Sequence, residues 1–158
     1  MNIKFAAIIA AVVMPHMAFA VSVTGNATVQ IQSAIAATQT QQMNFGVVSP
    51  TATAGVVTLS PAGVATSGTL GTYGTAAAGQ FSITAQPSTA LNVTFTNGSV
   101  TSGANSMTVD TFTSTSTPAS NTTDASGNLA LNVGANLNVG ANQAAGTYNG
   151  TYTVMVNY

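Results

Sequence analysis

The chain of 158 residues has no cysteine and no tryptophan, and it has one basic residue, one histidine and two acidic residues. The missing cysteines exclude disulfide bonds. Lys4 and His16 both lie within the first twenty residues, so the remainder carries only Asp110 and Asp124 as charged side chains. Ordinary domains are about 25% charged. We therefore expect neither nucleic acid nor an anionic membrane surface as a partner, because Lys and Arg provide most of the binding to both.

The missing side chains also exclude most enzyme chemistry. Without His, Lys, Glu or Cys after residue 20, general acid–base and nucleophilic catalysis lack their usual groups. A glycosidase pair would need Asp110 and Asp124 together, yet one lies in an apparent strand and the other in a loop. Calcium would find a single carboxylate at residues 124–128, so we interpret this segment as a turn that Asp124 caps. We predict no enzyme, no catalytic residue, no metal and no cofactor.

The first residues predict export. Lys4 supplies a positive charge within an apolar stretch from Ile3 to Met14, and Ala18-Phe19-Ala20 matches the small-x-small pattern of a cleavage site. The apolar stretch is shorter than the roughly 20 residues of a membrane span, so we expect no stable membrane insertion. We expect a secreted protein, reaching a bacterial cell surface or an extracellular fibre through the periplasm. The expected parts are a signal peptide at 1–20, an N-terminal extension or donor strand at 21–36 and a β-sandwich domain at 37–158.

Alternation with a period of two dominates the rest of the chain. Apolar and polar residues alternate from Phe81 to Ala85, from Leu91 to Thr96 and from Leu129 to Val133. Short alternating segments separated by Gly, Asn and Pro are typical of a sandwich or barrel, so we predict an all-β fold with an immunoglobulin-like β-sandwich. Phe112 falls out of phase with its neighbours, which predicts a β-bulge.

Two segments have unusual composition. The hexapeptide LNVGAN occurs twice in succession, at 131–136 and 137–142. Two copies are too few for a β-solenoid, so we predict two short strands joined through Gly134 and Ala135. Residues 113–126 are rich in Ser and Thr and predict a long exposed loop, with a mucin-like tract as the alternative.

Both ends of the chain after residue 20 alternate. One face of the last segment holds Tyr148, Tyr152, Val154, Val156 and Tyr158, and the odd positions of the first segment hold Val21, Val23, Ala27, Val29, Ile31 and Ile35. Such a terminal strand can complete its own sheet or the edge of another molecule's sheet. The last segment is accordingly a candidate acceptor strand or an ordinary core strand.

The last segment also carries a resemblance. Residues 134–140 (GANLNVG), residues 146–158 (GTYNGTYTVMVNY) and the earlier Met43-Asn-Phe-Gly46 resemble blocks of a family of uncharacterised secreted bacterial proteins. That family in turn resembles chaperone–usher pilins. The resemblance implies an incomplete sandwich, a periplasmic chaperone that grips the C-terminal strand and its carboxylate, and an outer-membrane usher. It also implies that the 21–35 region of a neighbouring subunit completes the fold. The cysteine pair of many pilins is missing here.

The sequence therefore predicts a structural, pilin-like subunit of an extracellular fibre, whose main partners are copies of itself. The alternative is a monomeric cell-surface adhesin or a carbohydrate-binding β-sandwich. A third interpretation is an amyloid-type matrix fibre, favoured by low charge and high β-propensity and opposed by frequent Gly and several Pro.

Overall fold

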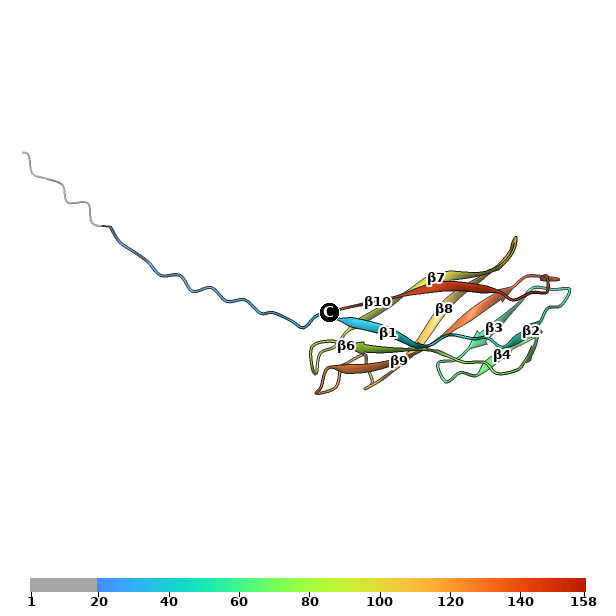
Figure 1. Ribbon diagram of the computed structural model, residues 1–158, viewed down its shortest axis with the longest axis horizontal. Coiled ribbons are helices and arrows are strands. Elements are labelled where there is room, and N and C mark those ends of the chain that lie inside the picture. Colours follow the sequence, from blue (N-terminus) through green and yellow to red (C-terminus); the bar gives the residue numbers. More distant parts are fainter. Residues whose placement is uncertain (1–19) are drawn as a thin grey trace, which may run out of the picture. The chain divides into compact units, whose positions relative to one another are not determined.

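The computed structural model describes residues 20–158, which fall into two units. The predicted signal peptide lies outside the described residues except for Ala20. Residues 20–31 contain neither helix nor strand (Figure 1). All of them are exposed. No helix among the described residues is long and apolar enough to cross a membrane.

Residues 32–158 form the second unit, which we call the sandwich, and its regular elements are all strands. They are β1 (Ala36–Gln41), β2 (Val47–Ser49), β3 (Gly55–Leu59), β4 (Ala65–Ser67), β5 (Gly71–Tyr73), β6 (Gly79–Thr84), β7 (Asn92–Ser102), β8 (Asn105–Thr117), β9 (Asn128–Val139) and β10 (Asn149–Asn157). The predicted all-β sandwich is confirmed.

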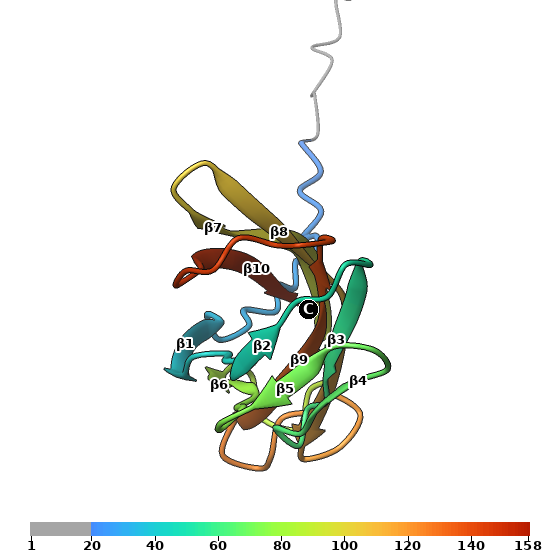
Figure 2. The same cartoon turned by 90° about the vertical axis from the view of Figure 1, so that its right-hand side faces the viewer.

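Eight strands form one antiparallel sheet in the order β1-β6-β9-β8-β7-β10, with β3 and β4 added beside β9. Strands β2 and β5 form a separate pair. Figure 2 shows how the large sheet curls, so that β10 and β1, the two ends of the path, lie along the same side of the sandwich. The curled sheet encloses two apolar clusters.

Strand β9 is the centre of the fold, because it contributes to both clusters. Its inward side chains are all buried: Leu129, Leu131, Val133, Ala135, Leu137 and Val139. The predicted break at Gly134–Ala135 is wrong, since β9 runs without interruption through the first hexapeptide and into the second, as far as Val139. An even repeat length keeps the apolar residues on one face. Residues 128–133 pair with β6, and residues 135–139 pair with β3.

Two other predictions from the sequence concern strand β8. The predicted bulge at Phe112 is confirmed, because the pairing of β8 with β9 shifts register between Asp110 and Thr113, and Thr111 has a φ of 48°. The exposed loop predicted from residue 113 is wrong at its start, since β8 continues to Thr117. Ser and Thr alternate there between exposed and half-buried positions. This pattern is typical of a strand with one face toward the core and the other toward solvent.

Candidate functional site

The candidate site is the open seam, which we define as the facing backbone edges of β1 and β10. These strands end the sheet path, and within the described residues no backbone pairing joins them. An unpaired edge presents free N–H and C=O groups that can pair with another strand. Figure 2 shows β7, β10, β1 and β6 in that order along this side of the sandwich.

Strand β1 forms one side of the open seam and is exposed along its whole length. All six of its residues are exposed. Ala37 pairs with Ile83 of β6, and directly opposed residues of an antiparallel pair lie on the same face. Ile83 is fully buried whereas Ala37 is exposed. The inward face of β1 is therefore exposed to solvent at Ala37, whereas the facing position of β6 is buried.

Strand β10 forms the other side, and its inward face is apolar but incompletely covered. Val154 and Val156 pair with Phe95 and Val93 of β7. All four side chains pack against the cluster that contains Ile83 and Leu131, yet all are only half-buried. The corresponding side chains of β9 are buried. Apolar core surface is thus exposed on the β10 side of the open seam, whereas the inward positions of β1 hold Ala37 and Gln39.

Aromatic rings line the inward side of β10. The Tyr152 ring lies edge-on to Phe81, with centroids 6.2 Å apart, and tilted against Phe112 at 5.1 Å. Its hydroxyl is buried and has no hydrogen-bond partner among the described residues. Burial raises the pKa of this phenol. Space for the hydroxyl exists because Gly79 has no side chain, since a Cβ there would overlap it.

One end of the open seam is bridged by a side chain. The Tyr158 hydroxyl accepts a hydrogen bond from the backbone N–H of Gln86 at 3.0 Å and donates one to the backbone carbonyl of Ser33. The backbone N–H and the hydroxyl of Ser33 both donate to Gln86 Oε1, at 3.2 and 3.1 Å. Ser33 precedes β1, and Gln86 follows β6. These contacts place the start of β1 beside the end of β10.

The predicted donor and acceptor residues lie in different settings. Val21, Val23, Val29 and Ile31 are 83–88% exposed, and Ala27 is exposed as well. Ile35 instead packs half-buried against the sandwich core. The exposed segment outside the sandwich therefore ends at Ile31. The boundary moves from residue 37 to residue 32, since the sandwich begins at Gln32. Tyr148 lies just before β10, where its hydroxyl donates to the Ala144 carbonyl and accepts from Gln143 Nε2.

A family model described as Domain of unknown function (DUF4402) matches residues 35–158. The chain belongs to this family. The DUF4402 match covers the sandwich from the residue before β1 and leaves the exposed segment 20–31 outside it. Comparisons with curated proteins and with solved structures gave no match.

The Met43–Gly46 block of the DUF4402 chain links the open seam to a surface hollow. Met43 packs against both apolar clusters. Asn44 exchanges backbone hydrogen bonds of 2.8 Å with Ala77, and its side chain accepts one from the Gly46 N–H. Gly46 has a φ of +79° and leaves no room for a Cβ beside the Tyr73 carbonyl. The block therefore fixes the chain between β1 and β2.

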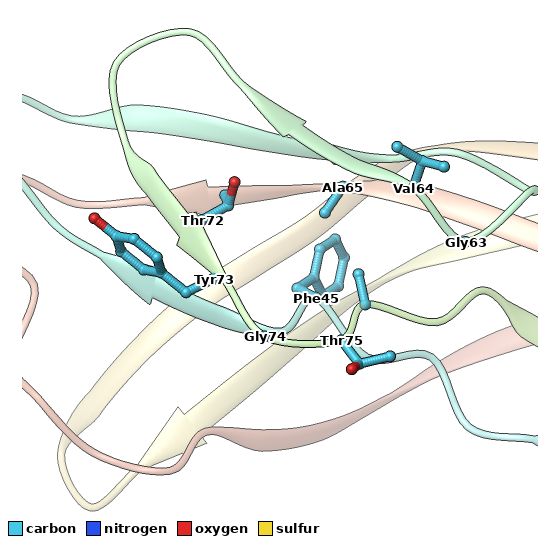
Figure 3. Close-up of a pocket in the computed structure, with 9 residues that line it drawn as sticks. Phe45, Gly63, Val64, Ala65, Thr72, Tyr73, Gly74 and Thr75 are labelled. Carbon is cyan, nitrogen blue, oxygen red and sulfur yellow. The ribbon is translucent and has the colours of Figure 1, made fainter.

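The hollow itself has a volume of about 430 Å³. Its nine lining residues carry no charge and include Phe45, Val64, Thr72 and Tyr73. Figure 3 shows Phe45 in the middle of the lining with Ala65 above it, whereas the Tyr73 ring points away. Tyr73 and Val64 are exposed. Such a surface suits apolar or hydroxyl-rich groups and offers no acid or base.

The two carboxylates have local structural roles. Asp110 accepts hydrogen bonds from Asn138 Nδ2 at 2.8 Å and from the Thr111 hydroxyl. The capping role predicted for Asp124 is confirmed, because its Oδ1 accepts the backbone N–H groups of Ser126 and Asn128 at 2.8 Å each. These bonds, with the Asn128 N–H first, lower the pKa of Asp124. Within the described residues, no group of three His, Cys, Asp or Glu side chains could hold a metal.

The sequence did not point to Ser33, Gln86 or Gly79. Ser33 and Gln86 act through backbone groups as well as side chains, and neither interrupts an alternating pattern. Gly79 is the first residue of β6 and lies two positions before the alternating segment that starts at Phe81. A glycine inside or beside a strand can mark a close approach by another group. That signal could have identified the position, although not its partner Tyr152.

Proposed function

We propose that this DUF4402 protein is a secreted, pilin-like structural subunit that assembles into an extracellular fibre by strand donation. Residues 21–31 of one copy would occupy the open seam of the next and pair with β10 and β1. The observation that carries the proposal is the apolar surface exposed at the open seam, in a chain whose exposed N-terminal segment alternates in the pattern that such a seam accepts.

The dimensions and energies are compatible with this assembly. Strand β10 has nine residues, which span about 30 Å at 3.3 Å per residue, and the segment from Val21 to Ile31 is slightly longer. Burying three or four of its large aliphatic side chains at about 1.5–3 kcal/mol each gives a gross gain on the order of 10 kcal/mol. Association and ordering offset much of this gain. Because none of the side chains in the segment is charged, burying them has no ionic desolvation cost.

Chain connectivity favours one direction for the donated strand. Ile31 precedes the sandwich directly, and the start of the sandwich lies beside the end of β10 through Ser33 and Tyr158. Each subunit's own extension therefore leaves from this end. A neighbour that donates a strand would collide with this extension unless the neighbour's own sandwich lay at the opposite end of the open seam. The donated strand should run antiparallel to β10, and copies would join head to tail.

The proposal includes assistance during export. Before a donor arrives, the half-buried residues Val154 and Val156 and the free edge of β10 would favour aggregation. A periplasmic chaperone that covers β10, followed by an outer-membrane usher, would protect this surface. A nearly neutral surface rich in Thr would then pack against identical copies without like-charge repulsion.

A truncation experiment tests strand donation. The sandwich unit (32–158) is purified without the extension, and its melting temperature is measured with and without a peptide of residues 20–31. We expect the peptide to raise the melting temperature by several degrees at concentrations above its Kd. A matched peptide with Val29→Asp and Ile31→Asp should have no effect. Equal melting temperatures with and without the unchanged peptide would contradict the proposal.

A second candidate function is a monomeric adhesin or a carbohydrate-binding sandwich, and the hollow beside exposed Tyr73 favours it. Aromatic faces and hydroxyl groups are common at such surfaces. If this alternative holds, the mature chain should remain monomeric, and Tyr73→Ala should abolish binding to a glycan array. If strand donation holds, Tyr73→Ala should leave fibre formation unchanged.

A further inference from the structure

The residues Ser33, Gln86 and Tyr158 form what we call the terminal clasp. Its four hydrogen bonds tie the end of β10 to the residue that follows β6 by two positions and to the segment before β1. Backbone groups of Ser33 and Gln86 take part in three of these bonds. Within the clasp, the Tyr158 side chain is the part that crosses from one side of the open seam to the other.

The position of the clasp matters for any strand that enters the open seam. Neighbouring strands lie about 4.8 Å apart, so one missing strand leaves its two neighbours roughly 10 Å apart. A tyrosine side chain with one hydrogen bond can span such a distance. Tyr158 therefore occupies the space in which the backbone of an incoming strand would otherwise continue.

Alternation alone does not fix how far a donated strand enters. A slip by one residue would turn every apolar side chain outward, but a slip by two residues keeps the same face inward. Several registers of the segment 21–31 therefore bury Val, Ala and Ile side chains. A fixed end to the open seam would choose among them.

We propose that Tyr158 is the end stop of the open seam and sets the register of the donated strand. This inference rests on the proposed function. With the strand antiparallel to β10, its first residues arrive at the clasp. Residues 23–31 are about as long as β10, so Val21 is left outside the open seam while Val23 and the later apolar residues enter it. Removing the clasp would lengthen the open seam and admit Val21.

The test uses the mature chain (21–158) as acceptor, with Val29→Asp and Ile31→Asp in its own extension so that it cannot donate. Peptides 21–31 and 23–31 are titrated against acceptors that carry Tyr158, Tyr158→Phe or Tyr158→Ala. With Tyr158 intact, the two peptides should bind within about twofold of each other. With Tyr158→Ala, the longer peptide should bind about tenfold more tightly than the shorter one. This ratio corresponds to the free energy of burying one valine side chain. Tyr158→Phe should shift the ratio in the same direction.

The control is Tyr148→Phe, which loses hydroxyl hydrogen bonds to Gln143 and Ala144 but lies at the other end of β10. It should keep the peptide ratio of the unchanged acceptor. If both peptides bind and their ratio is the same with and without Tyr158, the end-stop inference is overturned while strand donation stands. If neither peptide binds any acceptor, both proposals fail.

Hydrogen exchange in the acceptor without peptide tests the clasp separately. The Gln86 amide should exchange faster in Tyr158→Phe than with Tyr158 present, because its acceptor is lost. Tyr148→Phe should leave that amide unchanged. Equal Gln86 exchange rates in all three proteins would show that the clasp does not persist in solution and would overturn the inference.

Discussion

The hydroxyl of Tyr152 occupies the place where a side chain on Gly79 would begin. Gly79 opens β6 and Tyr152 lies in β10, so the contact joins two strands from near the opposite ends of the sheet path. The Tyr152 ring packs against Phe81 and Phe112, while its hydroxyl has no partner among the described residues. A polar group is thus buried in the part of the core nearest the open seam.

The Gly79–Tyr152 contact predicts a rescue between two substitutions. Tyr152→Phe should be neutral or stabilise the sandwich by about 1 kcal/mol, because it removes a buried hydroxyl without a partner. Gly79→Ala should destabilise by about 1–3 kcal/mol, since the new Cβ overlaps that hydroxyl. In the double variant most of this cost should disappear, because the next ring atom, Cζ, lies at an ordinary 3.6 Å.

Urea unfolding of the four proteins measures this cycle, and the interaction free energy between the two positions should exceed about 0.5 kcal/mol. Additive effects of the two substitutions would mean that Gly79 is required for another reason.

Gly134 should tolerate no side chain. It lies where β9 changes partner from β6 to β3, and a Cβ there would overlap the Leu59 carbonyl and contact backbone atoms of Ser60 and Pro61. Backbone cannot move aside as a flexible side chain can, so Gly134→Ala should cost about 3 kcal/mol or prevent folding. The control is Gly68→Ala, with no atom within 4 Å of the new Cβ. It should lie within about 0.5 kcal/mol of the unchanged protein. If Gly134→Ala were as stable as Gly68→Ala, the close approach of the Leu59 carbonyl to Gly134 would be contradicted.

The turn that Asp124 caps should depend on pH. Backbone hydrogen bonds, with the Asn128 N–H first, lower the pKa of Asp124 from 3.8. A lowered folded-state pKa gives stability that is complete above the unfolded-state value and is lost as the pH falls through the folded-state value. The stability difference between the unchanged protein and Asp124→Asn should therefore be constant above about pH 5 and shrink below it.

Urea unfolding of both proteins between pH 2 and 7 measures this dependence. A difference that stays constant down to pH 2 would mean that the Asp124 charge does not support the turn.

The alternating patterns predicted much of the fold, because they reflect burial on one face of a strand. The strands from Gly79 to Thr84 and from Asn149 to Asn157, the bulge near Phe112 and the Asp124 turn all follow from local sequence. Strand β9 did not, because glycine usually weakens a strand, and the reason for Gly134 lies in the distant Leu59. The Ser- and Thr-rich composition hid the end of β8 for a similar reason, since alternation between two polar residues leaves no hydrophobic signal.

The candidate site was predicted in part. Both alternating ends were recognised, but the limit of the extension at Ile31 depends on Ile35 packing against the sandwich core. The terminal clasp joins residues 72 and 125 positions apart in the sequence. Hydrogen bonds to distant backbone groups require no particular local pattern, so the sequence alone did not reveal them.

The absence of cysteine makes the central claim directly testable by disulfide trapping. Two forms of the chain 21–158 are mixed and oxidised, one with Gln30→Cys in its extension and the other with a cysteine at an exposed position of β10. Gln30 alternates with the apolar residues, so its side chain should point outward from the open seam together with Thr151, Met155 and Asn157. Paired strands bring such positions within the 4.4–6.8 Å between Cα atoms that a disulfide needs.

An antiparallel donated strand predicts that Gln30→Cys forms a covalent dimer most readily with Thr151→Cys, near the start of β10. Asn157→Cys, at the far end, should react least of the three. Thr58→Cys on β3, which is exposed but distant from the open seam in the sheet order, is the control and should form few dimers. Dimers concentrated at β10 are the expected result; equal yields at β10 and Thr58, or none at either, would contradict strand donation into the open seam.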